Sequence, residues 1–190
     1  AMTEAVVARF GKVDILVNSA YSGIHKAFEE MSAEEFQSAL TGGVTSAFLC
    51  AQSVIRVMKR YGRGNIINIG SAYGVVSPDQ RIYGNSAINS PCNYGAAKAG
   101  VIQFTRWLAI YLAPHGIRVN CLSPGGFYDE AQRGKQDYEE VFVRRYSERT
   151  PLARMGGKTD LKGGVVFLAS AASEYVTGHN LMIDGGWTAW

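Results

Sequence analysis

The 190-residue sequence has few of the residues that mark metal and disulfide proteins. It contains only three cysteines, which are far apart and show no CxxC spacing: Cys50, Cys92 and Cys121. The histidines are equally isolated, without acidic or cysteine partners at metal-ligand spacing: His25, His115 and His179. A disulfide framework is therefore not indicated, and we predict no metal site.

The sequence also lacks a strong charge of one sign and a long apolar run. Lys and Arg number 19 against 16 Asp and Glu, and the excess is scattered, which argues against a nucleic-acid-binding face. No run approaches the ~18 to 20 apolar residues of a membrane span, and the first residues do not resemble a signal peptide. We predict a soluble cytoplasmic protein that contacts neither nucleic acid nor membrane.

What the sequence does contain is an alternation of strand and helix signals. Short apolar runs that read as strands buried on both faces occur at 14–20, 65–71 and 118–122, and a last strand at 180–183. Helical spacing of apolar residues covers 1–10, 36–59, 94–112 and 161–169. The length and the hydrophobic content of 47% suit one domain over 1–190. We predict an α/β fold with a doubly wound parallel sheet.

Two connections are rich in polar residues, glycine and proline: 77–93 and 125–155. Substrates of α/β folds usually bind at connections that leave the carboxyl ends of strands, so 125–155 is the predicted substrate-loop region. This region is basic, which suits an anionic sugar or a nucleotide-sugar phosphate. A solvated helix face is an equally good interpretation of its basic residues: Arg133, Lys135, Arg144, Arg145, Arg149 and Arg154.

Tyr94 and Lys98 stand four residues apart at the start of a predicted helix, so their side chains share one face. This spacing alone is common on helix surfaces. Its surroundings are less common, because Ser71 ends one predicted buried strand and the segment SPGG ends the next.

In this context the chain resembles the short-chain dehydrogenase/reductase family. The resemblance runs nearly end to end, through motifs in the family's order: VDILVNSA, NIINIGS, YGAAKAGV, GIRVNCLSPGG, PLARMG, FLAS and YVTGHNLMIDGG. It implies a Rossmann-like fold and NAD(P)-dependent hydride transfer at a hydroxyl or carbonyl carbon.

The resemblance assigns Tyr94 the role of general acid/base, and an ammonium such as that of Lys98 nearby favours a phenolate. It also implies that Lys98 hydrogen-bonds the nicotinamide ribose and that Ser71 donates to the reacting oxygen. The alternative for Ser71 is a hydroxyl that caps its own loop. By the same resemblance, NAD or NADP contacts these residues: Asn18, Ala20, Tyr94, Lys98, Pro124, Gly125, Gly126 and Phe127.

The chain departs from the family pattern at several positions. Gly43 stands where most members have an asparagine that holds a proton-relaying water, and Tyr21 replaces a glycine. The segment FYDEAQRG lacks the usual threonine contact to the nicotinamide, a role that backbone groups of Gly126 and Phe127 are candidates to fill. Gly42 and Gly43 within a helix each cost roughly 1 kcal/mol relative to alanine, which suggests a kink or a close backbone contact.

The connection between Ser71 and Tyr94 is longer than the family usually has, at little cost in loop entropy. It is expected to bring Tyr83, Asn85 or Asn89 near the mouth of the pocket. Together with SPGG and the ending DGGWTAW, it resembles a subgroup associated with surface-sugar and flagellin modification. The expected substrate is a small molecule, with sugar derivatives among the candidates.

No glycine-rich GxxxGxG turn occurs in the sequence, although the family's pyrophosphate site precedes the strand at Ile15. We therefore expect the chain to correspond to roughly the last four strands of the family sheet. The strand at Ile15 is then an exposed edge, which another chain, a rearrangement or a missing segment must cover.

Two functions remain open from the sequence. One is an NAD(P)-dependent oxidoreductase that uses Ser71, Tyr94 and Lys98. The other is a truncated, non-catalytic remnant that acts as an oligomeric or interaction module without binding dinucleotide. A homo-oligomer, dimer or tetramer, is expected in either case, with Trp187 and Trp190 at a subunit interface or in a frayed tail.

Overall fold

The computed structural model describes residues 2–84, 90–128 and 139–190. Its four parallel strands lie side by side in chain order. They are β1 (Ile15–Asn18), β2 (Gly64–Ile69), β3 (Ile117–Pro124) and β4 (Asn180–Ile183). The predicted parallel α/β sheet is confirmed by this pairing. Parallel strands need crossover connections, and the segments that contain the helices provide them.

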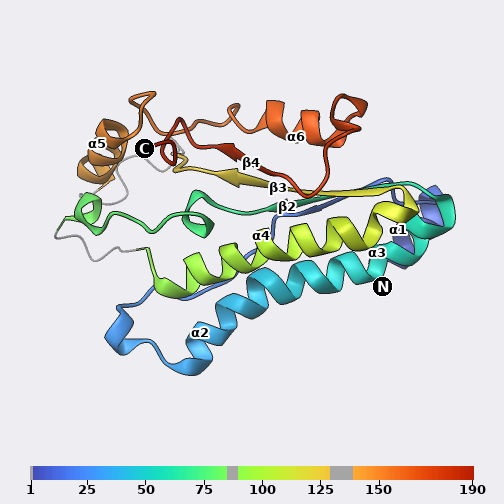
Figure 1. Ribbon diagram of the computed structural model, residues 1–190. Helices are drawn as coiled ribbons and strands as arrows, with labels where there is room; N and C mark the ends of the chain where they lie inside the picture. Colours follow the sequence, from blue (N-terminus) through green and yellow to red (C-terminus); the bar gives the residue numbers. More distant parts are fainter. Residues whose placement is uncertain (1, 85–89, 129–138) are drawn as a thin grey trace.

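Helices cover both faces of this sheet (Figure 1). The α-helices are α1 (Met2–Phe10), α2 (Ala33–Leu40), α3 (Ser46–Tyr61), α4 (Cys92–Leu112), α5 (Glu139–Arg149) and α6 (Lys162–Ala169). Short turns are η1 (Phe28–Glu30), η3 (Ala72–Gly74), η4 (Gln80–Tyr83), η5 (Ala113–His115) and η7 (Ala171–Ser173), and η2 (Thr41–Thr45) is π-helical. In Figure 1, α3 and α4 lie along one face of the sheet and α6 lies on the other.

The core follows the two-residue period of the strands. Ile66 and Val119 point to one face and pack with α3 and α4, whereas Ile67 and Leu122 point to the other and pack with Leu168 of α6. All five side chains are fully buried. Burial on both faces explains why β2 and β3 are nearly continuous apolar runs.

Strand β1 lies at an edge of the sheet, as predicted, but its faces are more exposed than predicted. Ile15 and Val17 are 43% and 45% exposed, so β1 is not buried on both faces as predicted. Leu16 packs against the α3 and α4 side, and β1 pairs only with β2 among the described strands. Strand β1 is apolar in composition, but no described segment covers the face that carries Ile15 and Val17.

Helices α2 and α3 join through η2 into one helical stretch, Ala33–Tyr61, which contains the predicted helix 36–59. The predicted close contact at the glycine pair is confirmed, since a Cβ atom on Gly42 would overlap Ser22. By length and composition alone this stretch could cross a membrane, and core helices of soluble proteins pass the same test. Here α2 and η2 pack against α4.

Candidate functional site

The three residues expected to catalyse the reaction come from two neighbouring elements. Tyr94 and Lys98 lie on the first two turns of α4, and Ser71 precedes η3 just after the carboxyl end of β2. The backbone of η3 lies directly on α4, because a Cβ atom on Gly74 would come within 2.8 Å of the Lys98 carbonyl carbon. Only glycine permits this approach, which brings the end of β2 to the start of α4.

Lys98 is 5% exposed, and its ammonium is held at the end of the sheet. Nζ donates a hydrogen bond of 2.9 Å to the carbonyl oxygen of Ile69. Nζ also lies 5.8 Å from the ring centroid of Tyr94 and 5.2 Å from that of Tyr21. Burial lowers the pKa of Lys98 from its ordinary value, because the surrounding protein solvates the charge less well than water.

The capping alternative for Ser71 is realised in the structure. Its hydroxyl oxygen accepts a hydrogen bond of 3.1 Å from the Tyr73 backbone N–H. A serine hydroxyl has one proton and two lone pairs, so this bond leaves the proton available for donation. Ser71 is 6% exposed, which keeps the hydroxyl in a largely dry environment. Capping and donation to a reacting oxygen are therefore compatible.

Asn18 links the end of β1 to the strand and helix that hold the site. Its Nδ2 donates to Asn68 Oδ1 at 2.8 Å, and Asn68 Nδ2 donates to Thr105 Oγ1 at 2.9 Å. Thr105 in turn donates to the Val101 carbonyl oxygen within α4. Asn68 and Thr105 are buried, so the chain of bonds braces β1, β2 and α4 against one another. Ala20, two residues beyond Asn18, is exposed.

The segment after β3 is held by backbone hydrogen bonds. Gly125, next to Pro124, donates to the Ile183 carbonyl oxygen. Gly126 donates its N–H to Tyr146 Oη at 2.6 Å, and its carbonyl oxygen accepts from the Gly156 N–H at 2.9 Å. Both backbone groups of Gly126 are thus engaged within the protein, which weakens the expectation that they contact a nicotinamide. Phe127 forms a parallel bridge with Gly156.

An aromatic cluster beside Ser71 was not predicted from the sequence. Its members come from η3, η4, α5 and the C-terminal turn: Tyr73, Tyr83, Phe142, Tyr146 and Trp187. The Tyr146 and Trp187 rings stack with centroids 4.1 Å apart, and Tyr83 stacks on Phe142 at 5.3 Å. Burial raises the pKa of Tyr146 to about 12.

The aromatic cluster changes two expectations. Tyr83 is buried in it and is 8% exposed, so it forms a wall rather than an open rim. Trp187 is 5% exposed within its own chain and is not free for a subunit interface, whereas Trp190 is 76% exposed. Several other predicted residues lie outside the described part of the chain: Asn85, Asn89, Arg133 and Lys135. Among described residues no group of histidine, cysteine and acidic side chains could hold a metal.

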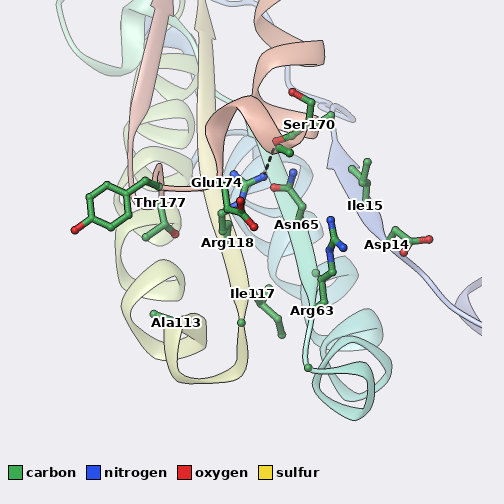
Figure 2. Close-up of a pocket in the computed structure, with 16 residues that line it drawn as sticks. Asp14, Ile15, Arg63, Asn65, Ala113, Ile117, Arg118, Ser170, Glu174 and Thr177 are labelled. Carbon is green, nitrogen blue, oxygen red and sulfur yellow. Dashed lines mark hydrogen bonds between the residues drawn. The ribbon is translucent and has the colours of Figure 1, made fainter.

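A pocket of about 950 Å³ lies at the opposite end of the sheet, and Figure 2 shows residues that line it. It is lined by the first residues of the strands, including Ile15, Asn65 and Ile117, whereas Ser71 follows a strand's carboxyl end. The Arg118 guanidinium is occupied there by carbonyl oxygens, including those of Leu168 and Ser170. This pocket is therefore separate from the predicted site.

The parallel sheet with helices on both faces places the chain in the Rossmann-like α/β class, with the candidate side chains at the carboxyl ends of its strands. A family model described as enoyl-(acyl carrier protein) reductase matches residues 1–188. The structure is similar to a short chain dehydrogenase from Leptospira borgpetersenii with bound NAD+, with TM-score 0.87 and 44% identity, covering 98% of this chain and 69% of that one.

Two sequence relatives agree with this match. The chain is 33% identical to the 3-oxoacyl-[acyl-carrier-protein] reductase FabG of Vibrio cholerae over 98% of its own length and 71% of the relative's. It is 35% identical to the 5-keto-D-gluconate 5-reductase of Escherichia coli, over 98% and 69%. The chain belongs to the short-chain dehydrogenase/reductase family of NAD(P)-dependent oxidoreductases.

Proposed function

We propose that this chain catalyses NAD(P)-dependent hydride transfer at a hydroxyl or carbonyl carbon, with Tyr94 as the general acid/base. The observation that carries the proposal is the position of the Lys98 ammonium, which donates to the Ile69 carbonyl oxygen at 2.9 Å and lies 5.8 Å from the Tyr94 ring centroid. A buried positive charge beside a phenol favours its ionised form, which is the form that accepts a proton from an alcohol.

The proton chemistry follows from the donors that meet at this edge of the sheet. In reduction, Tyr94 gives its hydroxyl proton to the carbonyl oxygen, and Lys98 stabilises the phenolate that remains. Ser71, whose hydroxyl oxygen already accepts from the Tyr73 N–H, donates a hydrogen bond to the same oxygen without transferring its proton and stabilises the negative charge that develops there. In oxidation the same groups act in the reverse order.

A nicotinamide cofactor fits the donor set of the site, because a buried ammonium and a hydroxyl proton are available where a ribose and a reacting oxygen would meet them. Such a cofactor supplies or accepts the hydride. The residues proposed to hold it are Asn18, Ala20, Tyr94, Lys98, Pro124, Gly125, Gly126 and Phe127. Asn18 would do so through the framework it braces, since its amide already bonds Asn68.

We infer a small polar substrate, with a sugar acid or another sugar derivative as the favoured class. The wall beside Ser71 carries phenol groups, and Tyr83 donates to Tyr73 across it at 3.4 Å. One relative is named for a keto sugar acid and another for an acyl thioester on a carrier protein. A hydroxyl-rich wall favours a substrate that can exchange hydrogen bonds with it.

A homo-oligomer is also proposed. Helices α3 and α4 expose large apolar side chains on their outer surfaces: Phe48, Leu49, Trp107, Ile110 and Tyr111. Trp107 and Tyr111 stack at 5.1 Å, and the Lys59 ammonium of α3 lies 4.8 Å from the Tyr111 ring centroid. Exposed apolar patches that link two helices are typical of protein interfaces.

Titration of the purified chain with NADH and with NADPH, followed by fluorescence and by thermal stability, tests the oxidoreductase. Cofactor oxidation is then measured with 5-keto-D-gluconate and with a 3-oxoacyl thioester. We expect micromolar binding of one cofactor and turnover of at least one carbonyl compound. Failure to bind either dinucleotide at millimolar concentration would favour the non-catalytic module instead.

A further inference from the structure

Tyr21 lies in contact with both members of the proposed acid/base pair. Its ring stands edge to face with that of Tyr94, with centroids 5.2 Å apart and planes at 90°. The Lys98 Nζ atom lies 5.2 Å from the Tyr21 centroid, closer than its 5.8 Å to Tyr94. The ammonium therefore lies within cation–π range of two aromatic rings.

Gly43 lies against this ring. A Cβ atom on Gly43 would be in ordinary van der Waals contact with two ring carbons of Tyr21, at 3.7 and 3.9 Å, and would crowd the Ala97 Cβ at 3.2 Å, so the ring limits the side-chain atoms beyond Cβ. Gly43 is itself buried, so a larger side chain has no open route to solvent. The two departures noted separately in the sequence, Tyr21 and Gly43, thus meet in space.

Gly42, next to Gly43, allows the backbone beside Tyr21 to lie close to η2. A Cβ atom on Gly42 would come within 2.8 Å of the Ser22 backbone nitrogen and would overlap two other Ser22 atoms. The π-helical turn Thr41–Thr45 therefore presents a surface without side chains at two successive positions. Residues 21 and 22 dock on that surface.

We propose that Tyr21 is a positioning residue whose ring, seated against Gly43, holds the Lys98 ammonium against Tyr94. This inference rests on the proposed function of that pair. The Ile69 carbonyl oxygen takes one ammonium proton, and the Tyr21 ring attracts the charge without offering an oxygen that competes for the others.

The phenol group of Tyr21 does not duplicate the role of Tyr94. Burial, and secondarily the nearby Tyr94, raises the pKa of Tyr21 above that of an ordinary phenol. Tyr21 therefore stays protonated under conditions in which an acid/base group must exchange its proton. The ring, not the hydroxyl, is the part of Tyr21 that the geometry uses.

Titration of the full chain labelled with [13Cε]lysine tests this role without substrate or cofactor. The Lys98 signal is assigned by its loss in Lys98→Met. Burial already lowers the pKa of Lys98, and removal of the ring in Tyr21→Leu should move its titration midpoint further downward, by roughly half a pH unit, because the ring no longer stabilises the ammonium. Tyr21→Phe keeps the ring and should keep the midpoint.

Cys121 also interacts electrostatically with Lys98, and the Tyr21 variants leave it in place. The activity of Tyr94→Phe separates the two proposals. If that variant is as active as the parent chain, the acid/base role of Tyr94 is wrong, whatever the Lys98 midpoint does. If Tyr21→Leu leaves the Lys98 midpoint unchanged, or if Tyr21→Phe shifts it as far as Tyr21→Leu, the positioning role of the ring is refuted.

A double-mutant cycle of melting temperatures tests the contact between Tyr21 and Gly43, even if Tyr21→Leu folds poorly. Gly43→Asn should lower the melting temperature by ~5 °C when Tyr21 is present, because the new side chain meets the ring. The same substitution in a Tyr21→Gly background should cost clearly less. Asparagine has a higher helix propensity than glycine, so helix propensity does not explain the loss. Equal decreases in melting temperature in both backgrounds would refute the proposed contact between Tyr21 and Gly43.

Discussion

Replacing Thr105 by valine should destabilise the protein through the hydrogen-bonded chain that begins at Asn18. Thr105 is 1% exposed, and its hydroxyl accepts from Asn68 Nδ2 at 2.9 Å while donating to the Val101 carbonyl oxygen at 2.8 Å. Valine keeps the shape of threonine and removes the acceptor. Asn68, which is fully buried, is then left with an N–H group that has lost its partner.

The expected loss follows from the cost of an unsatisfied buried donor, about 1 to 3 kcal/mol. The Val101 carbonyl oxygen loses one bond but keeps the position of a helical acceptor, so its contribution is smaller. We expect a decrease of about 2 kcal/mol in the free energy of unfolding. For a chain of this size that corresponds to a fall of roughly 4 to 8 °C in melting temperature.

Thermal and urea unfolding of Thr105→Val and Thr105→Ser measure this effect. Serine keeps the hydroxyl and loses one buried methyl group, at about 1 kcal/mol. The hydrogen-bond explanation requires valine to cost more than serine. It is refuted if Thr105→Val is as stable as the parent chain, or if the serine variant is the less stable of the two.

Three further predictions concern the rest of the described structure. The hydrogen bond from Arg81 and the charge of Arg149 hold the pKa of Asp79 at about 2, below its ordinary 3.8. A carboxyl group with a lowered folded pKa stabilises above its unfolded value and loses that effect as pH falls. The stability difference between the parent and Asp79→Asn should therefore shrink between about pH 4 and pH 2, and a constant difference in pH-dependent melting would contradict this. Trp187→Ala should cost about 3 to 5 kcal/mol in urea unfolding, because the ring is buried and stacked, and a loss below about 1 kcal/mol would mean that the aromatic cluster does not support the fold. Ile110→Lys, at a side chain 77% exposed, should lower the mass measured by light scattering if α4 forms the subunit interface, and an unchanged oligomer would place that interface elsewhere.

The sequence predicted the strands and the main helices because their apolar periods are strong. Strand β2 is buried on both faces as predicted, except at its last residue, Ile69, which is half-buried, and Tyr94 and Lys98 lie on α4 as their spacing indicated. The same reasoning failed at β1, since an apolar run does not reveal whether a helix covers its second face. Ile15 and Val17 are therefore more exposed than predicted.

The contacts around the site were harder to predict because they join distant segments. The stacking of Tyr146 on Trp187 depends on where α5 and the C-terminal turn meet, and no local pattern encodes that meeting. Neither alternative predicted for Trp187, a subunit interface or a frayed tail, included its burial in this cluster. Tyr21 and Gly43 were each recognised as departures from the family, but only the fold brings them together.

Steady-state kinetics of Tyr94→Phe test the central claim most directly, with Tyr111→Phe as the matched control. Tyr111 lies farther along α4, is 52% exposed and stacks on Trp107. Loss of a positioned acid/base group typically costs a factor of about 100 to 10,000 in rate. We expect a fall of at least about 100-fold in kcat for Tyr94→Phe and little change for Tyr111→Phe. Equal activity of Tyr94→Phe and the parent chain would contradict it.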